Sequence, residues 1–316
     1  MPRASIRFDQ IAAACPLMHT YSIVARDPAT GQLGVAVQSH YFSVGSVVPW
    51  AEAGVGAIAT QSLTDPSYGP LGLDLMRAGR SAPDALAGLV ASDPGREVRQ
   101  VAMVDCYGYA AAHTGALAIA EAGHVVGEGF SVQANMMLRN TVWAAMAEAY
   151  RSANGELVDR LLAALDAAEA EGGDIRGRQS AALLIVEAKG TGRPWSDKVF
   201  DLRVDDAPEP LLELRRLVDV SRAYTHRRRA AMALERNDLQ AMSAEFEEAS
   251  RLIGNNPEMR FLQAVALLRA GQIDDGIAIL REVVARDRNW QKLALRLPEF
   301  MLPHDPALFE RIRMLP

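Results

Sequence analysis

Thr20-Tyr21-Ser22-Ile23-Val24-Ala25 is a short stretch rich in β-forming residues, with a hydroxyl residue at its head. Asp27-Pro28-Ala29-Thr30-Gly31 follows as a turn, and Leu33-Gly34-Val35-Ala36-Val37 is a second stretch of the same kind. Such runs, separated by Pro and Gly, are typical of a β-hairpin. The sequence therefore predicts a hairpin whose first strand starts at Thr20. Nineteen residues precede Thr20, so its nitrogen belongs to a peptide bond in the chain as written.

The composition indicates a globular protein. The 316 residues leave room for about two domains of roughly 150 residues each. Hydrophobic residues make up 49% of the chain, which argues against disorder. The net charge of −6 does not supply the basic face that nucleic-acid binding requires, so no nucleic-acid partner is expected. No apolar run approaches the ~18 residues of a membrane-spanning helix, so no membrane partner is expected either.

Cysteine usage and motifs bear on location and cofactors. Cys15 and Cys106 make no disulfide framework, which favours a reducing compartment and predicts a cytoplasmic protein. The chain has no Gly-x-Ser-x-Gly, no His-Glu-x-x-His, no Walker loop and no strand-linked Gly-x-Gly-x-x-Gly. We therefore expect neither a metal nor an organic cofactor.

The chain divides into two regions of different pattern. Up to about residue 204, β runs punctuated by glycine alternate with helical blocks, and beyond it every segment reads as helix. Asp205-Asp206-Ala207-Pro208-Glu209-Pro210 marks the join, because two prolines oppose regular structure. We expect an extension over 1–19, a mixed domain over 20–205 and a helical domain over 206–316.

The order of elements in the first region predicts its fold class. Strands, a helix pair, strands, a second helix pair and strands follow one another, and consecutive hairpins give antiparallel sheets with helices in outer layers. The predicted fold is α+β, a four-layer α/β/β/α sandwich. The expected strands are 21–25, 33–41, 56–61, 100–105, 109–113, 125–127, 181–187 and 199–204, and the expected helices are 69–78, 82–91, 135–153 and 157–171.

The helical region contains an internal repeat. Asn237 and Gly271 are 34 residues apart, and at that offset small and apolar residues fall in register on both sides. The matched pairs are Ala230 with Ala264, Leu234 with Leu268, Ala244 with Ala278, Phe246 with Leu280, and Ala249 with Val283. A 34-residue helix–turn–helix period is typical of tetratricopeptide repeats. We expect helices near 211–224 and 307–314 to cap this stack or to dock on the first domain.

Candidate site residues are polar residues that interrupt or end apolar strands. They are Ser39 and His40, Thr60 and Gln61, His113, and Asn135. Hydroxyls and amides at strand ends commonly cap turns and helices, but loops that converge over a rigid scaffold also build sites. Asn135 either caps a helix that starts near Met136 or donates to an oxyanion beside that helix end, and the two roles can coexist. Ser39 with His40 is a poor catalytic pair, because adjacent strand residues face opposite sides.

Ordered blocks along the chain carry a family resemblance. They are Thr20-Tyr21-Ser22-Ile23-Val24-Ala25-Arg26-Asp27, Gly34-Val35-Ala36-Val37-Gln38-Ser39, Val48-Pro49-Trp50-Ala51, Gly54-Val55-Gly56-Ala57, Ala59-Thr60-Gln61, Ser67-Tyr68-Gly69-Pro70, Asp93-Pro94-Gly95-Arg96, His113-Thr114-Gly115, Ala122-Gly123-His124, Ser131-Val132-Gln133-Ala134-Asn135-Met136-Met137 and Gly177-Arg178-Gln179-Ser180-Ala181-Ala182. These blocks, within about residues 19–205, closely resemble a mostly bacterial domain-of-unknown-function family classed in the N-terminal nucleophile (Ntn) hydrolase superfamily. The helical tail resembles one that some members carry, labelled as peptidoglycan-binding.

The resemblance implies the αββα Ntn fold and hydrolysis of a small amide or peptide-like bond. In such enzymes the N-terminal residue attacks a carbonyl while its own α-amine acts as base. Carried onto this chain, Thr20 is the nucleophile, Asn135 is the oxyanion donor, and Ser39, His40, Thr60, Gln61 and His113 line the substrate pocket. Typical members begin Met-Thr, whereas here the bond between His19 and Thr20 must be cleaved before the amine is free.

A second function of a different class is an inactive Ntn scaffold that binds a ligand or a protein partner. Tetratricopeptide stacks usually hold peptides in a concave groove, so the helical repeats would be the interaction surface. The sequence is also compatible with a homo-oligomer. The mass of the mature chain distinguishes the two functions, because only the enzyme needs Thr20 at the N-terminus.

Overall fold

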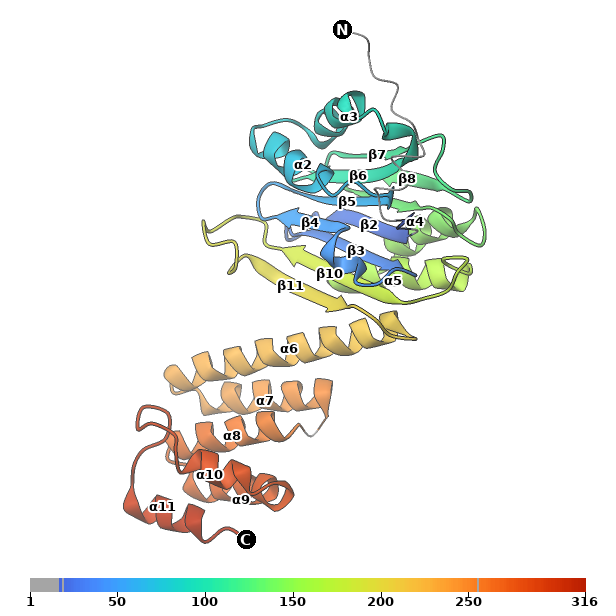
Figure 1. Ribbon diagram of the computed structural model, residues 1–316. Coiled ribbons are helices and arrows are strands. Elements are labelled where there is room, and N and C mark those ends of the chain that lie inside the picture. Colours follow the sequence, from blue (N-terminus) through green and yellow to red (C-terminus); the bar gives the residue numbers. More distant parts are fainter. Residues whose placement is uncertain (1–16, 19, 255) are drawn as a thin grey trace. The chain divides into compact units, whose positions relative to one another are not determined.

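The computed structural model describes residues 17–18, 20–254 and 256–316 (Figure 1). The chain forms two compact units, one that extends to Arg216 and one that runs Leu217–Pro316. Most of the predicted N-terminal extension, residues 1–16 and residue 19, lies outside the described residues. The boundary predicted at residue 205 falls shortly before a helix, α6 (Pro210–Glu235), that continues across the division between the units.

Two antiparallel sheets make up the first unit. The first sheet has the order β1-β5-β6-β7, with β4 also paired to β5, and its strands are β1 (Leu17–Met18), β4 (Pro49–Glu52), β5 (Gly56–Leu63), β6 (Arg99–Asp105) and β7 (Ala110–Thr114). The second sheet has the order β11-β10-β3-β2-β9-β8, and its strands are β2 (Thr20–Arg26), β3 (Leu33–Ser39), β8 (Gly123–Gly127), β9 (Phe130–Ala134), β10 (Ser180–Val186) and β11 (Lys198–Val204). The predicted hairpin is confirmed, since β2 and β3 pair with Thr20 opposite Ser39.

The two sheets pack against each other through an apolar cluster. In both sheets the contributing residues alternate along the strand, because successive side chains point to opposite faces. The buried members on the strands are Val24, Leu33, Val35, Val37, Ala57, Ala59, Ala102, Val104, Ala182 and Val186. Burial of this size is the main stabilising term of the unit.

A helix pair covers the outer face of each sheet. On the first sheet, α2 (Tyr68–Arg77) and α3 (Ala82–Ser92) bury Ile58 and Met103 beneath Leu73 and Leu86. On the second sheet lie α4 (Val142–Ser152) and α5 (Leu157–Ala170). A glycine permits the close approach of α5, because a Cβ at Gly34 of β3 would lie 2.9 Å from Leu161 and 3.2 Å from Leu157.

The prediction of antiparallel sheets in a mixed α/β region followed by a helical region is confirmed. The prediction is wrong about the start of one helix and omits three strands. Helix α4 begins at Val142 rather than at Asn135, because Met136 has a left-handed φ of 56° that no α-helix continues through. The predicted strands do not include Phe130–Ala134, yet this segment is strand β9, whose alternating polar residues face the other sheet. Strands β1 and β4 also lie outside the predicted set.

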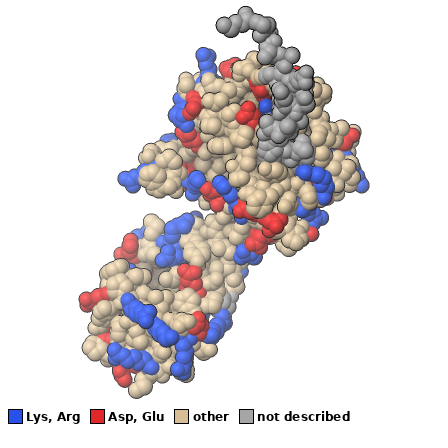
Figure 2. All heavy atoms as spheres, in the orientation of Figure 1, with Lys and Arg blue, Asp and Glu red and all other residues tan. Residues whose placement is uncertain are grey.

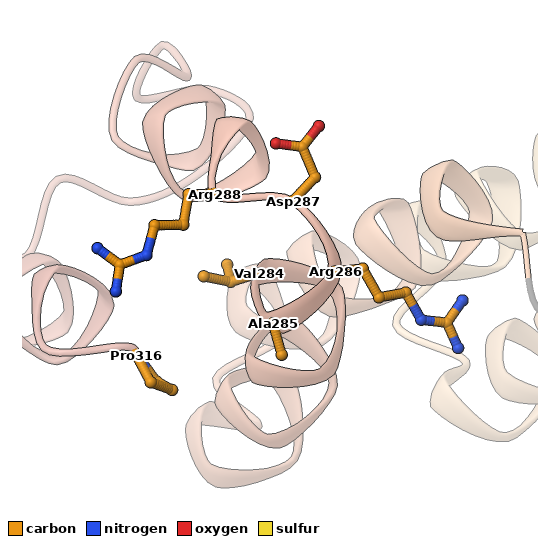
Figure 3. Close-up of a pocket in the computed structure, with 6 residues that line it drawn as sticks. All are labelled: Val284, Ala285, Arg286, Asp287, Arg288 and Pro316. Carbon is orange, nitrogen blue, oxygen red and sulfur yellow. The ribbon is translucent and has the colours of Figure 1, made fainter.

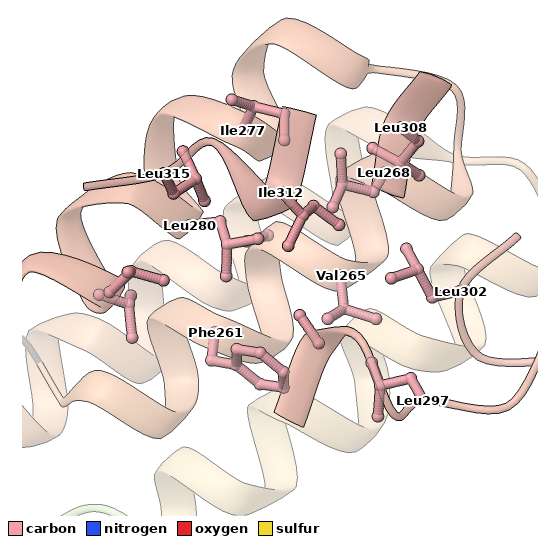
Figure 4. Close-up of a cluster of buried hydrophobic side chains, with 14 residues drawn as sticks. Phe261, Val265, Leu268, Ile277, Leu280, Leu297, Leu302, Leu308, Ile312 and Leu315 are labelled. Atoms are coloured by element: carbon pink, nitrogen blue, oxygen red, sulfur yellow. The ribbon is translucent and has the colours of Figure 1, made fainter. Parts of the chain in front are cut away.

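The second unit is all helical and has its own core. Its helices are the later part of α6, then α7 (Leu239–Ile253), α8 (Pro257–Arg269), α9 (Ile273–Arg286), α10 (Asn289–Ala294) and α11 (Pro306–Arg313). Figure 4 shows Phe261, Leu280 and Ile312 within a cluster to which α8 to α11 all contribute. A second cluster joins α6, α7 and α8 through Ala230, Met242, Phe246 and Leu267.

The 34-residue offset has a structural counterpart in this unit. Asn237, between α6 and α7, has φ 58°, and Gly271, between α8 and α9, has φ 80°. The matched residues Ala230 and Ala264 are both fully buried. Two successive helical hairpins therefore turn at equivalent positions and bury equivalent residues.

Candidate functional site

Thr20 lies at the start of an interior strand, inside the unit. Strand β2 has β3 on one side and β9 on the other, and the side chain of Thr20 is fully buried. Its Oγ1 donates a hydrogen bond to Ser39 Oγ at 3.1 Å, across the β2–β3 pair. Strand register therefore brings together the predicted nucleophile Thr20 and the predicted pocket residue Ser39.

Two residues hold the carbonyl oxygen of Thr20, one on β5 and one directly after β9. Asn135 donates to it from its main-chain nitrogen at 3.1 Å and from Nδ2 at 3.3 Å. Gln61, on β5 of the opposite sheet, donates from Nε2 at 3.0 Å. Buried carbonyls that accept this many bonds are fixed in position, so the backbone at Thr20 is tied to both sheets.

Gln100, on β6, organises these two donors. Its Oε1 accepts from Gln61 Nε2 at 2.7 Å and from Asn135 Nδ2 at 3.0 Å. Its Nε2 donates to the Ala134 carbonyl at 2.9 Å, which sets the orientation of the amide. Each Nδ2 hydrogen of Asn135 thus has an acceptor, one on Thr20 and one on Gln100.

Further hydroxyls and amides extend the network along the sheet interface. Ser22 Oγ donates to Gln61 Oε1 at 2.6 Å and accepts from Gln133 Nε2 at 2.6 Å. Ser131 Oγ donates to Gln133 Oε1 at 3.1 Å. The members of this network, which we call the polar layer, are Thr20, Ser22, Ser39, Gln61, Gln100, Ser131, Gln133 and Asn135, and all are fully buried and uncharged. The interface between the sheets is therefore polar near Thr20 and apolar farther along the strands.

The polar layer reaches the surface at a histidine. Gln100 Nε2 donates to Thr114 Oγ1 at 2.9 Å, and that hydroxyl lies 2.8 Å from His124 Nδ1. Thr114 and His124 therefore share a hydrogen bond at the outer end of the polar layer. Loss of solvent around the ring, with a smaller effect from His113, lowers the pKa of His124 and favours its neutral form.

Backbone strain accompanies the two donors to Thr20. Gln61 is followed by Ser62 with φ 74°, and Asn135 is followed by Met136 with φ 56°. A left-handed conformation costs a residue other than glycine about 1–3 kcal/mol and persists where the surroundings impose it, often at functional sites. Both strained residues thus adjoin the residues that hold the carbonyl of Thr20.

The chain passes from one sheet to the other immediately before Thr20. In β1, Leu17 pairs with Leu63 and Met18 pairs with Ser62 of the first sheet. Two residues after Met18, Thr20 pairs with Ser39 of the second sheet. Leu17 and Met18, shortly before the predicted nucleophile, therefore occupy a strand position beside β5.

Three predicted pocket residues lie apart from the polar layer. Thr60 Oγ1 donates to the Asp65 carbonyl at 3.1 Å, on the helix-covered face of β5. His113 Nε2 lies 2.8 Å from the Arg96 carbonyl, on the corresponding face of β7. His40 follows Ser39 and contacts Asp174 and the Arg178 carbonyl. Successive side chains of a strand point to opposite faces, so Thr60 and His113 face the helices because their neighbours Gln61 and Thr114 face the other sheet.

The sequence predictions missed Ser22, Gln100, Ser131 and Gln133. Ser22, Ser131 and Gln133 each lie two positions along a strand from another polar residue, with an apolar residue between them. That alternation is the signal by which these three could have been found, but on its own it also describes a strand with one solvent-exposed face. Gln100 carries no such signal, because Val98 and Ala102 stand at the corresponding positions.

Beneath β2, on its helix-covered face, Tyr21 anchors the strand to α5. Its hydroxyl donates to Glu169 Oε1, and Arg178 Nε pairs with Glu169 Oε2 at 2.6 Å. Burial, reinforced by the negative charge of Glu169, raises the pKa of Tyr21 well above its usual value. The phenol therefore stays protonated and fixes the strand from the side opposite the polar layer.

Open pockets lie elsewhere on the protein. In the first unit, one of about 360 Å³ is lined by Glu52, Arg77, Gly190, Asp197 and Lys198, and another of about 230 Å³ by Asp65, Tyr68, Leu71 and Asp93. In the second unit, a pocket of about 360 Å³ lies at the end of α9. Figure 3 shows Arg288 and Pro316 on one side of that helix end and Arg286 on the other. None of these three pockets includes Thr20.

Neither surface charge nor metal-binding side chains indicate a second site among the described residues. Acidic and basic side chains are interspersed on the face shown in Figure 2. In the part of the chain that the structure describes, no cluster of three His, Cys, Asp or Glu side chains could hold a metal ion. Over the same residues, none of the helices combines the length and the apolar character needed to cross a bilayer.

Comparison with known proteins assigns the first unit to a family. The family described as "Family of unknown function (DUF1028)" matches residues 20–214. A crystal structure of a DUF1028 protein from Silicibacter pomeroyi is similar, with 34% sequence identity and a TM-score of 0.57 over 63% of this chain and 88% of that chain. No curated protein matches the chain. The match covers more than half of the chain and begins at the first residue of β2, so this protein belongs to DUF1028, a family of unknown function.

Proposed function

We propose that the first unit is an Ntn-type amidohydrolase that becomes active when the bond before Thr20 is cleaved. The observation that carries the proposal is the position of Thr20, whose carbonyl is fixed by Asn135 and Gln61 while its Oγ1 contacts Ser39. A scaffold that fixes the backbone of a single threonine from both sheets is what a positioned nucleophile requires.

Two further observations support this reading. Helix pairs lie outside two antiparallel sheets that face each other, which is the arrangement of the αββα Ntn fold. The family match begins at residue 20, so the part of the chain shared by the family starts at the proposed nucleophile.

The proposed reaction has two halves. The freed α-amine of Thr20, with an ordinary pKa of about 7.7–8.0, takes the proton from Oγ1 as the oxygen attacks the substrate carbonyl. The amide C–N bond breaks, the leaving amine takes the proton, and the acyl group remains as an ester on Oγ1. Water then attacks that ester, and the acid is released with Thr20 regenerated.

The surrounding residues have distinct proposed roles. Ser39 positions the nucleophilic oxygen, because its Oγ lies 3.1 Å from Thr20 Oγ1. Gln61 and Gln100 position the Thr20 backbone, the first directly and the second through Asn135 and Gln61. Asn135 is the oxyanion donor of the proposal, and this role requires its Nδ2 to exchange one of its two present acceptors for the reacting oxygen.

The helical unit is proposed to be a tetratricopeptide-like module that binds a peptide or protein partner. The observation that favours this is the equivalence of Asn237 and Gly271, which turn two successive hairpins at a 34-residue offset.

The test of the enzymatic proposal compares the parent protein with its Thr20→Ser and Thr20→Ala variants, each processed so that position 20 is the N-terminus. We expect Thr20→Ala to abolish hydrolysis of amide substrates and Thr20→Ser to retain part of it, because serine keeps a nucleophilic hydroxyl. Thr30→Ala, which alters an exposed threonine in the turn after β2, is the matched control and should be fully active. Equal hydrolysis by the parent protein and the Thr20→Ala variant would exclude Thr20 as the nucleophile.

A further inference from the structure

We propose that the edge of β5 at Ser62 and Leu63 is the acyl-side substrate subsite, and that it takes a peptide in extended conformation. This inference rests on the proposed function and names the substrate class: peptides or peptidyl amides with at least three residues on the acyl side of the scissile bond. A small amide with a single acyl residue would fill only the position next to Thr20.

The structure already contains an occupant of this edge. Strand β1 lies antiparallel to β5, with Met18 opposite Ser62 and Leu17 opposite Leu63. One residue separates Met18 from Thr20, so the backbone beside β5 is the backbone that leads directly into the proposed nucleophile. When the bond before Thr20 is cleaved and this segment leaves, the edge of β5 at these two residues loses its partner.

The chemistry of acyl transfer places a substrate in the same position. In the acyl-enzyme, the carbonyl carbon of the substrate is bonded to Thr20 Oγ1, which is separated from the Thr20 nitrogen by the Cα and Cβ atoms. The acyl chain therefore starts within two atoms of the Thr20 nitrogen, and its second and third residues reach the edge that Met18 and Leu17 occupy. A peptide that adds a strand to an exposed edge gains affinity from main-chain hydrogen bonds.

Ser62 gives a second, independent observation at this edge. Its side chain is fully buried, and its Oγ has no hydrogen-bond partner among the described residues. It is also held at φ 74°, directly opposite Met18. A buried hydroxyl without a partner is destabilising, and a polar group on the second residue of the acyl chain would supply the missing partner.

The direction of the pairing also defines where a longer substrate runs. Because β1 is antiparallel to β5, residues farther from the scissile bond lie farther along β5, beyond Leu63. Next in the chain come Thr64, which is buried, and Asp65, which lines the pocket of about 230 Å³ near α2 and α3. The acyl side of a substrate therefore runs toward Thr64 and Asp65, whereas its leaving group is not constrained by this edge.

The experiment measures kcat/KM for a series of p-nitroanilides on protein that begins at Thr20. The acyl groups are acetyl-His, acetyl-Met-His and acetyl-Leu-Met-His, which reproduce the residues before Thr20. We expect kcat/KM to rise about 10-fold from the first to the third, which corresponds to about 1.4 kcal/mol. Acetyl-Leu-Pro-His is the matched control, and its proline should cancel the gain because it lacks the N–H and resists strand pairing.

A variant provides an independent check. Ser62→Gly relieves the strained conformation and removes the hydroxyl, so the protein should fold at least as stably. We expect the ratio of kcat/KM between the three-residue and one-residue substrates to fall in Ser62→Gly and to stay the same in Ser152→Gly, an exposed position at the end of α4.

The outcomes separate this inference from the proposed function. Equal kcat/KM across the series, or an equal gain with the proline control, would overturn the strand subsite and leave the hydrolase proposal intact. If a chain shown by mass to begin at Thr20 hydrolyses none of these anilides and no other amide, the hydrolase proposal fails and the subsite fails with it.

Discussion

Asn135 holds the carbonyl oxygen of Thr20 from two directions, through its main-chain nitrogen and through its side-chain Nδ2. The two residues are 115 positions apart in sequence, and β9 brings them together by pairing with β2. The start of the proposed catalytic strand therefore depends in part on a distant residue and on the strand that leads to it.

Removal of the Asn135 side chain should destabilise the first unit. Asn135→Ala leaves Gln100 Oε1 with one fewer donor in a fully buried site, so we expect a loss of about 1–3 kcal/mol. Asn135→Asp should cost more, because it places carboxylate oxygens against two acceptor oxygens. Calorimetry of the unfolding transition measures both, and Asn154→Ala, at an exposed position after α4, should change stability by less than about 0.5 kcal/mol. An unchanged transition in Asn135→Ala would show that the polar layer does not depend on this residue.

The close approach of α5 to β3 depends on the absence of a side chain at Gly34. Gly34→Ala would place its Cβ 2.9 Å from Leu161 Cδ1 and 3.1 Å from Ile185 Cγ1, so we expect a loss of about 1–3 kcal/mol from overpacking. Gly88→Ala is the opposite case, because a Cβ there meets nothing within 4 Å on an exposed turn of α3. It should stabilise by about 0.5–1 kcal/mol through helix propensity. Effects of the same sign in both variants would contradict the packing described for Gly34.

Alkaline conditions should destabilise the first unit through Tyr150. Burial, with opposing smaller effects from Arg160 and Asp27, raises the pKa of Tyr150 to about 12. Above about pH 10 the unfolded chain loses the phenolic proton while the folded chain keeps it, so the free energy of unfolding falls as pH rises. The slope should reach about 1.4 kcal/mol per pH unit for this residue between pH 10 and 12.

Tyr150→Phe is the control for that slope, because phenylalanine keeps the ring that packs 4.7 Å from the Phe130 ring. The free energy of unfolding of the parent protein, relative to that of Tyr150→Phe, should be constant below about pH 9 and should fall between about pH 10 and 12. Parallel pH curves would show that the phenol ionises equally in the folded and unfolded chains.

The two equivalent turns of the helical unit should respond differently to substitution. Gly271→Ala puts a Cβ on a residue with φ 80°, so we expect a loss of about 1 kcal/mol. Asn237→Gly relieves the same conformation at φ 58° and should be neutral or slightly stabilising. Thermal unfolding of the helical unit measures both effects, and a destabilising Asn237→Gly would show that the side chain of Asn237 contributes more than its backbone conformation.

The sequence was informative where structure is local. The hairpin from Thr20 to Ser39 was predictable because composition and turn residues lie within one short segment, and so was the 34-residue repeat. The site was not predictable in full, because it is made by register across strands that are distant in the chain. Nothing local to Gln100 indicates that it lies between Gln61 and Asn135, and the polar alternation of β9 resembles a loop that leads into a helix.

The intact mass of the protein isolated from its native cell tests the central claim most directly. The account predicts an active species whose mass matches a chain that begins at Thr20, and it predicts that Thr20→Ala leaves the preceding residues attached if the chain cleaves itself. A protein that hydrolyses amides while its mass still includes the residues before Thr20 would contradict the account, because Thr20 would then have no free amine to act as base.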